Sequence, residues 1–271
     1  MKYLIFFPFQ MLGDLWSKRE LIVHFTWREF VGRYRGAHLG LALSFVSPLF
    51  LLGIYTLVFG SLYRSSRTDT EGAGSFAITL FSALVFNNFM NDAVGRASKL
   101  VVENPNYITK VVFPVEILPV SLVGSALLHF FVNVLILIGG ILISPQPWHW
   151  TFFLFPVVVF PLMLICVGLS WFLAAVGVYF RDVASFVPPL MTALLFVSAI
   201  FYPVSSIPEA YQSWLLVNPM ACFSEMGRAI FTKGQVPPIG LWSYCFGVGV
   251  TCFFVGYTVF HRLKRGFSDA L

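Results

Sequence analysis

Long stretches without a charged residue are the feature that most constrains this chain. No Asp, Glu, Lys or Arg occurs in residues 36–63, 72–91, 117–180, 183–208 or 234–261. A helix needs about 20 apolar residues to cross a bilayer, and each run meets that length. The composition agrees, with 58% hydrophobic and 11% charged residues. The chain is therefore predicted to be an all-α integral membrane protein.

The charge-free runs predict six transmembrane helices. The 117–180 run is long enough for two crossings and is interrupted by the turn-forming sequence Ser144-Pro145-Gln146-Pro147, so it is divided there. No separate extramembrane domain is predicted, and residues 1–271 are expected to form one transmembrane domain. The expected spans cover about residues 37–62, 72–92, 115–143, 151–180, 184–203 and 238–261.

The basic residues between the spans predict the orientation. With the N-terminus in the cytoplasm, 13 of the 17 Lys and Arg residues fall on the inner side. Because basic residues concentrate in cytoplasmic loops, both termini are predicted to be cytoplasmic. The net charge of +5 follows from this bias and requires no nucleic-acid partner. The four outer basic residues are Arg64, Arg67, Arg228 and Lys233.

A helix of a different kind is predicted before the first span, over residues 12–35. At about 100° per residue, its large apolar side chains share one face, and the other faces are basic. A basic amphipathic helix with Trp on its apolar side is typical of a helix that lies in the membrane interface. It serves either as a simple anchor or also as a contact for a cytoplasmic partner. The apolar face comprises Leu12, Trp16, Val23, Trp27, Phe30 and Tyr34.

Two connectors between the spans carry most of the remaining information. Residues 96–114 are cytoplasmic in this topology, and their alternating charges with interspersed valines fit either a solvated linker or a helix that docks on another protein. Residues 205–233 lie outside and contain two apolar pieces, each too short to span. These pieces predict a re-entrant helical hairpin before the last span. Glu225 and Arg228, three residues apart, are expected to pair there.

Polar residues inside the spans are expected to face the bundle. Residues 87–92 include three Asn and one Asp, which fit either interhelical hydrogen bonds or part of a transport path. His129 and Asn133, four residues apart in the third span, are predicted to form a buried hydrogen-bonded pair.

The sequence shows no catalytic or metal-binding pattern. The five His residues have no paired spacing, and the four Cys residues have no CxxC pairing. A membrane enzyme would need an acid/base pair, for which only Asp69 with Glu71 or Glu209 with Glu225 could be nominated. There is no phosphate loop, and the charge-free runs hold no carboxylate that could couple to ions, which disfavours a secondary transporter or channel. If the chain pumps, a partner must supply the energy.

Four segments, in the same order along the chain, resemble the permease subunit of ABC-2 type exporters, especially those for O-antigen and related polysaccharides. They are LIVHFTWREFVGRYRGAHLGLALSFVSPLF, LVVENPNYITKVVFPVEILPV, YFRDVASFVPPLM and SSIPEAYQSWLLVNPMACFSEMGRAIF. The resemblance implies a homodimer of six-helix permeases in the bacterial inner membrane, with two copies of a separate cytoplasmic ABC ATPase. The ATPases would bind ATP and Mg²⁺, and this chain would bind no cofactor or metal. A lipid-linked glycan would leave between the two permeases.

The resemblance also implies roles for individual segments. Residues 12–35 would be the interface helix, residues 96–114 the coupling loop on the ATPase, and residues 205–233 the hairpin near the outer gate. The residues given these roles are Glu103, Asn104, Pro105, Tyr107 and Lys110 for coupling; Trp16, Trp27, Arg28, Phe30, Arg33 and Tyr34 for the interface helix; and Trp214, Asn218, Pro219, Glu225 and Arg228 for the hairpin.

Aromatic residues are abundant, with 31 Phe, 10 Tyr and 7 Trp. Rings that line a channel can stack on the apolar faces of sugars without demanding one sugar sequence, although interfacial belts account for many of them. Exporters of capsule, teichoic acid or drugs are neighbouring alternatives that the sequence does not separate. We nominate Tyr55, Phe59, Phe196, Phe201 and Tyr202 as pore-lining residues.

Overall fold

A computed structural model describes residues 13–34, 40–64, 73–109, 113–144 and 147–270, without the side chains at 41, 55, 56, 59–64, 73, 74, 109 and 269. These residues contain no β-strand, so the all-α prediction is confirmed for them. The long helices are α3 (Leu43–Arg64), α4 (Ala73–Val94), α6 (Ile117–Ile143), α7 (Phe155–Tyr179), α8 (Val183–Val197) and α11 (Ile239–Leu263). The shorter ones are α2 (Arg19–Gly32), η2 (Ala97–Lys99), α5 (Asn106–Thr109), α9 (Glu209–Leu216), α10 (Pro219–Arg228) and α12 (Phe267–Ala270).

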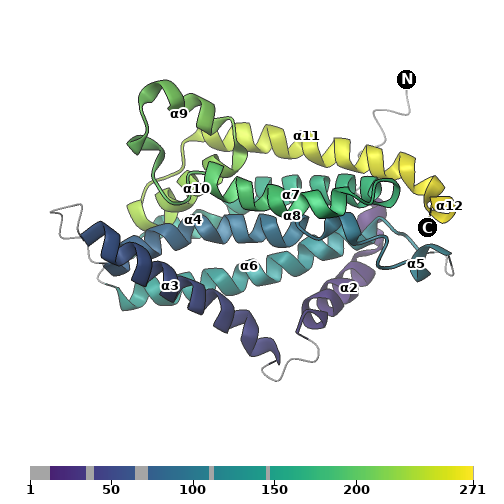
Figure 1. Cartoon of the computed structure of the whole chain (residues 1–271), viewed down its shortest axis with the longest axis horizontal. Coiled ribbons are helices and arrows are strands. Elements are labelled where there is room, and N and C mark those ends of the chain that lie inside the picture. Colours follow the sequence, from purple (N-terminus) through teal and green to yellow (C-terminus); the bar gives the residue numbers. More distant parts are fainter. Residues whose placement is uncertain (1–12, 35–39, 65–72, 110–112, 145–146, 271) are drawn as a thin grey trace.

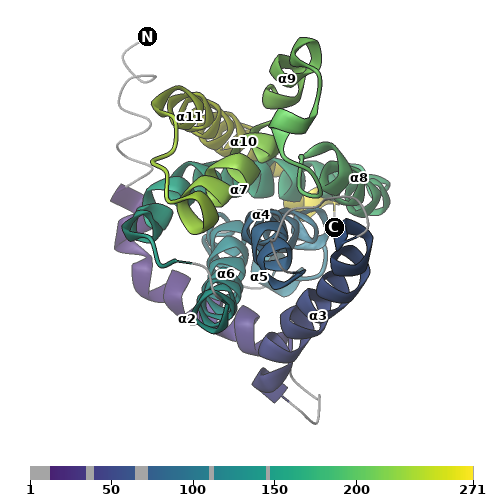
Figure 2. The ribbon, with the colours of Figure 1, turned by 90° about the vertical axis from the view of Figure 1, so that its left-hand side faces the viewer.

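Helices α4, α6, α7, α8 and α11 run along the long axis of the molecule, and α3 lies obliquely at the left (Figure 1). Each of them lies on one of the six predicted spans. Seen from one end, α4, α6 and α7 occupy the middle, with α2 and α3 on one side and α11 on the other (Figure 2). Among the described residues, three helical stretches are long and apolar enough to cross a membrane: 117–143, 150–179 and 239–266.

Helix α4 has 22 residues, with Asn87, Asn88 and Asp92 near its end. Helix α8 is shorter. It has 15 residues and ends at Val197, well before the predicted limit near residue 203. At about 1.5 Å per residue such a helix extends only about 22 Å, less than the roughly 30 Å hydrocarbon core.

Helices α7 and α11 pack with their backbones in direct contact. A Cβ atom added to Gly256 would lie 2.0 Å from the carbonyl oxygen of Gly168, and one added to Gly168 would lie 2.2 Å from that of Cys252. Small residues allow such close approach of membrane helices. Next to this contact the buried Trp171 ring lies 5.2 Å from that of Tyr257. Helices α7 and α11 form the most extensive contact between two helices among the described residues.

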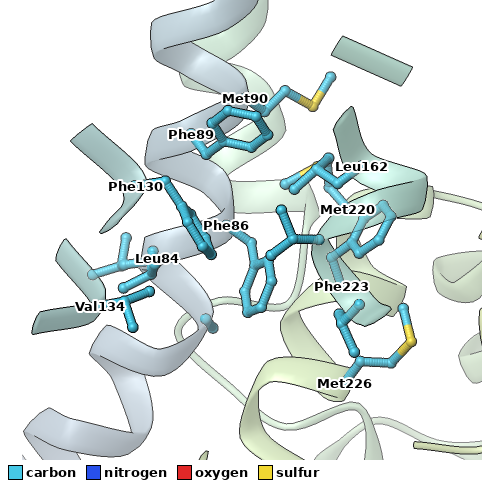
Figure 3. Close-up of a cluster of buried hydrophobic side chains, with 14 of the residues drawn as sticks. Leu84, Phe86, Phe89, Met90, Phe130, Val134, Leu162, Met220, Phe223 and Met226 are labelled. Atoms are coloured by element: carbon cyan, nitrogen blue, oxygen red, sulfur yellow. The ribbon is translucent and has the colours of Figure 1, made fainter. Parts of the chain in front are cut away.

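A second buried region joins α4 to α6 and to the short helix α10. The Phe86 ring of α4 lies 5.6 Å from Phe130 of α6 and 6.4 Å from Phe223 of α10. Figure 3 shows Phe223 and Met226 of α10 beside Phe86. All of these side chains are almost completely buried. Helix α10 is therefore anchored in the core, although it is too short to cross it.

The N-terminal helix differs from its prediction in extent. It is not continuous over 12–35, because the chain turns at Lys18 and α2 begins at Arg19. Helix α2 packs on α6, where a Cβ atom on Gly124 would lie 2.6 Å from the Thr26 hydroxyl oxygen. Leu12 lies outside the described residues.

The predicted apolar face of this helix is divided in the structure. Trp16 and Trp27 are 72% and 57% exposed, and Val23 is exposed too, whereas Phe30 is buried against the bundle. Tyr34 follows Phe30 inward and is half-buried. Phe30 and Tyr34 therefore pack on the bundle, whereas Trp16, Val23 and Trp27 remain exposed on the outside of the N-terminal segment.

Candidate functional site

Glu116 joins three segments at one end of the bundle, which we call the connector end because the described part of residues 95–116, including α5, lies there (Figure 1). Its Oε1 lies 3.0 Å from Lys18 Nζ, and its Oε2 lies 3.4 Å from Lys264 Nζ, beyond α11. Its carbonyl oxygen accepts a 3.0 Å hydrogen bond from Trp171 Nε1. Burial alone raises the pKa of Glu116, but a hydrogen bond from its own backbone and the two lysines lower it below the ordinary value. The carboxylate is held ionised between two cations.

Residues 95–116, which we call the connector, contact α2 through an aromatic cluster. The ring of Tyr107 lies 5.4 Å from Phe25 of α2 and 4.9 Å from Phe113. The Arg28 guanidinium lies 4.1 Å from the Phe25 ring centroid and donates a hydrogen bond to the Tyr107 hydroxyl. Arg28 and Tyr107, predicted in two separate functional segments, are thus in direct contact.

The opposite face of the connector lies on α7. A Cβ atom on Gly177 would lie 2.0 Å from the Ser98 carbonyl oxygen, so any larger residue at 177 would displace the connector backbone. Ser170 of α7 donates a 2.9 Å hydrogen bond to the carbonyl of Ala93, and Val101 is fully buried. The connector is therefore fixed to α2 on one side and to α7 on the other.

The tip of the connector, at residues 103–105, is partly exposed. Glu103 and Pro105 are exposed, and Asn104 donates a 2.9 Å hydrogen bond to the backbone carbonyl four residues earlier. The structure thus places three of the predicted coupling residues on one exposed turn. Tyr107 instead packs inward, and Lys110 lies outside the described residues.

Two further ion pairs join α2 to α4 and to the connector. Arg33 Nη1 lies 2.9 Å from Asp92 Oδ1, and Arg96 Nη2 lies 2.9 Å from Glu29 Oε1. Arg96 is 48% exposed, and its pair is accessible to water. Exposed pairs of this kind each contribute little to stability. The connector end is therefore held by several weak contacts between segments that are distant in sequence.

The predicted pair of His129 and Asn133 is buried, but its bonding differs from the prediction. Asn133 Nδ2 donates a 2.9 Å hydrogen bond to the backbone carbonyl of His129, as a short polar side chain in a helix can do. The His129 ring lies 3.1 Å from the Tyr34 hydroxyl and 4.8 Å from the Phe30 ring. His129 therefore bonds across to the N-terminal segment.

At the opposite end, which we call the hairpin end (residues 198–238), α9 and α10 form a helical hairpin. Both apolar pieces predicted there are helical. Asn218 caps α10 by accepting a 3.0 Å hydrogen bond from the Met220 N–H, and Pro219 occupies the first helical position, where no donor is needed. Trp214 of α9 is strongly exposed.

The predicted pair of Glu225 and Arg228 is present in this hairpin. Glu225 Oε1 lies 2.7 Å from Arg228 Nη1, and the arginine side chain is only 3% exposed. Arg228 also donates hydrogen bonds to the carbonyls of Ala199, at 2.6 Å, and of Ile200. A buried cation is tolerated only when paired and hydrogen-bonded in this way. The pair connects α10 to the chain that follows α8.

Three of the nominated pore-lining residues lie together where α8 ends. The rings of Phe196 and Phe201 are stacked with centroids 5.7 Å apart, and Phe196 is 60% exposed. The Tyr202 hydroxyl donates a 3.4 Å hydrogen bond to the Phe196 carbonyl. The side chains of Tyr55 and Phe59 lie outside the described residues.

Within the described part of the chain, no group of three or more His, Cys, Asp or Glu could hold a metal ion. Of the acid/base pairs nominated from the sequence, Glu225 is engaged by Arg228, and Glu209 is exposed at the start of α9. Asp69 and Glu71 lie outside the described residues.

Comparison with protein families decides the class. Residues 20–232 match the ABC-2 type transporter family, a stretch that includes α2, the connector and the hairpin. The chain belongs to this family. It is thus a transporter permease, as the four sequence segments indicated.

Known ABC-2 permeases are similar over nearly the whole chain. The chain is 28% identical over 265 residues to the O-antigen export system permease protein RfbA of Myxococcus xanthus, which covers 97% of this chain and 99% of that protein. It is 24% identical over 254 residues to RfbA of Klebsiella pneumoniae, covering 93% and 95%. It is also 24% identical over 242 residues to the polysialic acid transport protein KpsM of Escherichia coli, covering 88% and 91%.

The sequence analysis of this permease did not single out Glu116 with Lys18 and Lys264. The sequence does contain a signal for this site. Glu116 directly precedes the apolar run that starts at residue 117, and a carboxylate buried there must be paired with cations. The sequence gives no means of identifying those cations, since they lie 98 and 148 residues away.

Proposed function

We propose that this protein is the membrane-spanning permease subunit of an ATP-driven exporter that moves a lipid-linked polysaccharide of O-antigen type across the inner membrane. The observation that carries the proposal is the nearly full-length similarity to O-antigen export permeases inside a matched ABC-2 family. Relatives named for polysialic acid transport and capsule polysaccharide export favour a polysaccharide over a small drug.

In the proposed topology the chain crosses the membrane six times as one domain, with the connector end and both termini in the cytoplasm. The alternating directions of the long helices and the basic bias of the connector end support this arrangement (Figure 1). The hairpin end then lies outside, and residues 205–233 form a re-entrant hairpin. Trp16 and Trp27, exposed on the N-terminal segment, would lie among membrane lipids at the inner interface.

The energy would come from two copies of a cytoplasmic ABC ATPase, which bind ATP and Mg²⁺, acting on a permease homodimer. We propose that each ATPase contacts the exposed turn of Glu103, Asn104 and Pro105, with Lys110 nearby in sequence. Because the connector is fixed to both α2 and α7, a displacement of this turn would move both helices. Arg28 and Tyr107 would transmit part of that movement to the interface helix.

The route for the glycan would run along the aromatic residues near the outer end. We propose that Phe196, Phe201 and Tyr202 line it, with Tyr55 and Phe59 of the first span. Stacking on sugar faces accepts many sugar sequences, which suits a polymer exporter. The hairpin residues Trp214, Asn218, Pro219, Glu225 and Arg228 would close the outer mouth.

A test of the proposal is export in cells and ATP hydrolysis by the purified complex. Deleting the gene should abolish surface polysaccharide and leave the lipid-linked polymer inside, and the wild-type gene should restore display. Glu103→Lys should reduce ATP hydrolysis stimulated by the permease several-fold, while Glu209→Lys, an exposed Glu at the other end, should not. Normal surface polysaccharide in the deletion strain would refute the proposed function.

The topology has its own test by cysteine labelling from outside intact cells. A cysteine at Ser206 should react with an impermeant maleimide, and a cysteine at Glu103 should react only after the membrane is opened. External labelling at Glu103 would overturn the proposed orientation and, with it, the contact between the connector and the ATPase.

A further inference from the structure

Helix α8 ends at a turn whose residues, 198–200, are buried inside the protein. The helix ends at Val197, and Ser198, Ala199 and Ile200 are completely buried. The last carbonyls of any helix lack partners within it. At this position the protein must provide donors, because an unpaired buried carbonyl is costly.

The backbone at this point adopts a conformation that non-glycine residues rarely take. Ala199 has a φ of +52°, in the left-handed region. The helix does not continue through this residue, and the carbonyls of Ala199 and Ile200 both accept hydrogen bonds from Arg228 of α10. Such a conformation persists only when surrounding contacts stabilise it.

Those contacts come from the hairpin. Arg228 donates to both carbonyls, of Ala199 and Ile200, while its other nitrogen is paired with Glu225. The same Glu225 oxygen accepts a 3.0 Å hydrogen bond from the N–H of Val204, beyond the break. One buried ion pair therefore bonds the chain on both sides of the turn.

A second hairpin residue reinforces the same turn. Asn218 Nδ2 lies 3.1 Å from the Ser198 hydroxyl and 3.4 Å from the carbonyl of Val197. Asn218 is also the cap of α10, so the start and the end of α10 both bond to the chain after α8.

The break determines where two aromatic rings lie. In an unbroken α-helix, residues five apart differ by about 140° around the axis at about 100° per residue, so Phe196 and Phe201 could not stack. The break at Ala199 allows the two ring centroids to lie 5.7 Å apart, with an angle of 29° between the ring planes. Phe196 remains largely exposed, so the pair presents an aromatic surface.

We propose that Arg228 is a positioning residue, which holds the break in α8 so that Phe196 and Phe201 form one aromatic surface facing the outer part of the glycan route. The positioning role of Arg228 is independent of the proposed function, and only its effect on glycan export rests on that function. The guanidinium is required because its fixed planar donors reach two carbonyls and a carboxylate at once, whereas a lysine ammonium is a single point charge.

The test uses the full chain in membranes, with the four native cysteines replaced by alanine and cysteines placed at 196 and 201. A short bifunctional maleimide should cross-link these two positions quickly when Arg228 is present. In Arg228→Met and Arg228→Lys the cross-linking rate should fall at least tenfold. Arg181→Met, which removes an exposed arginine just before α8 and far from Glu225 in sequence, is the matched control and should leave the rate unchanged.

Export and ATP hydrolysis are then measured in variants with the native Phe residues. Arg228→Lys should lower the polysaccharide exported per ATP hydrolysed several-fold, without lowering ATP hydrolysis itself, a pattern that a general loss of folded protein would not give. If Arg228→Met fails to reach the membrane, Arg228→Gln, which keeps a neutral donor, gives the same cross-linking comparison.

An unchanged cross-linking rate in these Arg228 variants would overturn the proposal. Reduced cross-linking with normal export per ATP would retain the positioning role and refute its part in export. If the chain exports no glycan at all, only the proposed function fails, because the cross-linking comparison needs no substrate.

Discussion

The two ends of this permease are stabilised in opposite ways. At the connector end, four pairs of charged residues join separate segments, and the cation of each pair is at least 21% exposed. At the hairpin end, the central contact is made by Arg228, which is 3% exposed and bonded to two backbone carbonyls and a carboxylate. A cation that reaches water can leave its partner at a lower cost than a buried cation can. The connector end is suited to rearrange, and the hairpin end to keep its shape.

The largest expected effect comes from removing the carboxylate at the hairpin end. Glu225→Ala leaves the Arg228 cation buried without its counter-ion, which should lower the free energy of unfolding by about 3–5 kcal/mol. The melting temperature of the purified protein in detergent measures the loss. Glu209→Ala, on the exposed start of α9, is the control and should have no measurable effect. Equal melting temperatures for both variants would contradict the contrast between the two ends.

A smaller effect is expected where the connector lies on α7. Gly177→Val places carbon atoms where the Ser98 carbonyl now lies, which should cost about 1–3 kcal/mol and move the connector. ATP hydrolysis stimulated by the permease should drop with it. The control is Gly247→Val, at a position where an added Cβ has no neighbour within 4 Å. Normal stimulation by the Gly177 variant would show that the close approach is unimportant for coupling.

Glu116→Gln should cost about 1 kcal/mol at neutral pH, since its partners are partly solvated. Because the folded-state pKa of Glu116 lies below its ordinary value of 4.5, its ionisation stabilises the protein at pH values above about 4.5. This contribution is lost as the pH falls through the lower, folded-state pKa. The difference in melting temperature between wild type and Glu116→Gln should therefore be present at pH 7 and shrink below about pH 4.5. A difference in melting temperature that grows as the pH falls would show that the pKa of Glu116 is not lowered in the folded protein.

The smallest effect is expected for the exposed pair of Arg96 and Glu29. Each single alanine variant, and the double one, should change stability by about 0.2–1 kcal/mol. A double-mutant cycle on melting data gives the coupling between the two side chains. A coupling energy between Arg96 and Glu29 as large as the loss of stability expected for Glu225→Ala would remove the distinction between the two ends.

The parts of the fold that depend on local sequence were predictable. The charge-free runs located all six long helices, because hydrophobicity and length determine where such helices form. Asn218-Pro219 located the junction of the hairpin, since a capping residue followed by proline marks a helix start. Glu225 and Arg228 pair at the predicted spacing.

Features that depend on contacts between distant segments were not predictable. The turn that follows α8 is bonded by Arg228 of α10, which donates to the carbonyls of Ala199 and Ile200, and nothing in residues 184–203 signals that. The face of α2 that packs inward is set by Gly124 of α6. The His129 ring bonds to the Tyr34 hydroxyl, 95 residues away. The Asn133 side chain instead donates a hydrogen bond to the backbone carbonyl of His129. The roles assigned to the coupling, pore and gate residues remain predictions.

The contact between Gly168 and Gly256 has a consequence for the transport cycle. Two helices whose peptide groups touch cannot slide or tilt past each other without a steric clash, so α7 and α11 must travel together as one rigid unit. Relative movement of helices during transport is therefore expected at other helix contacts of the bundle.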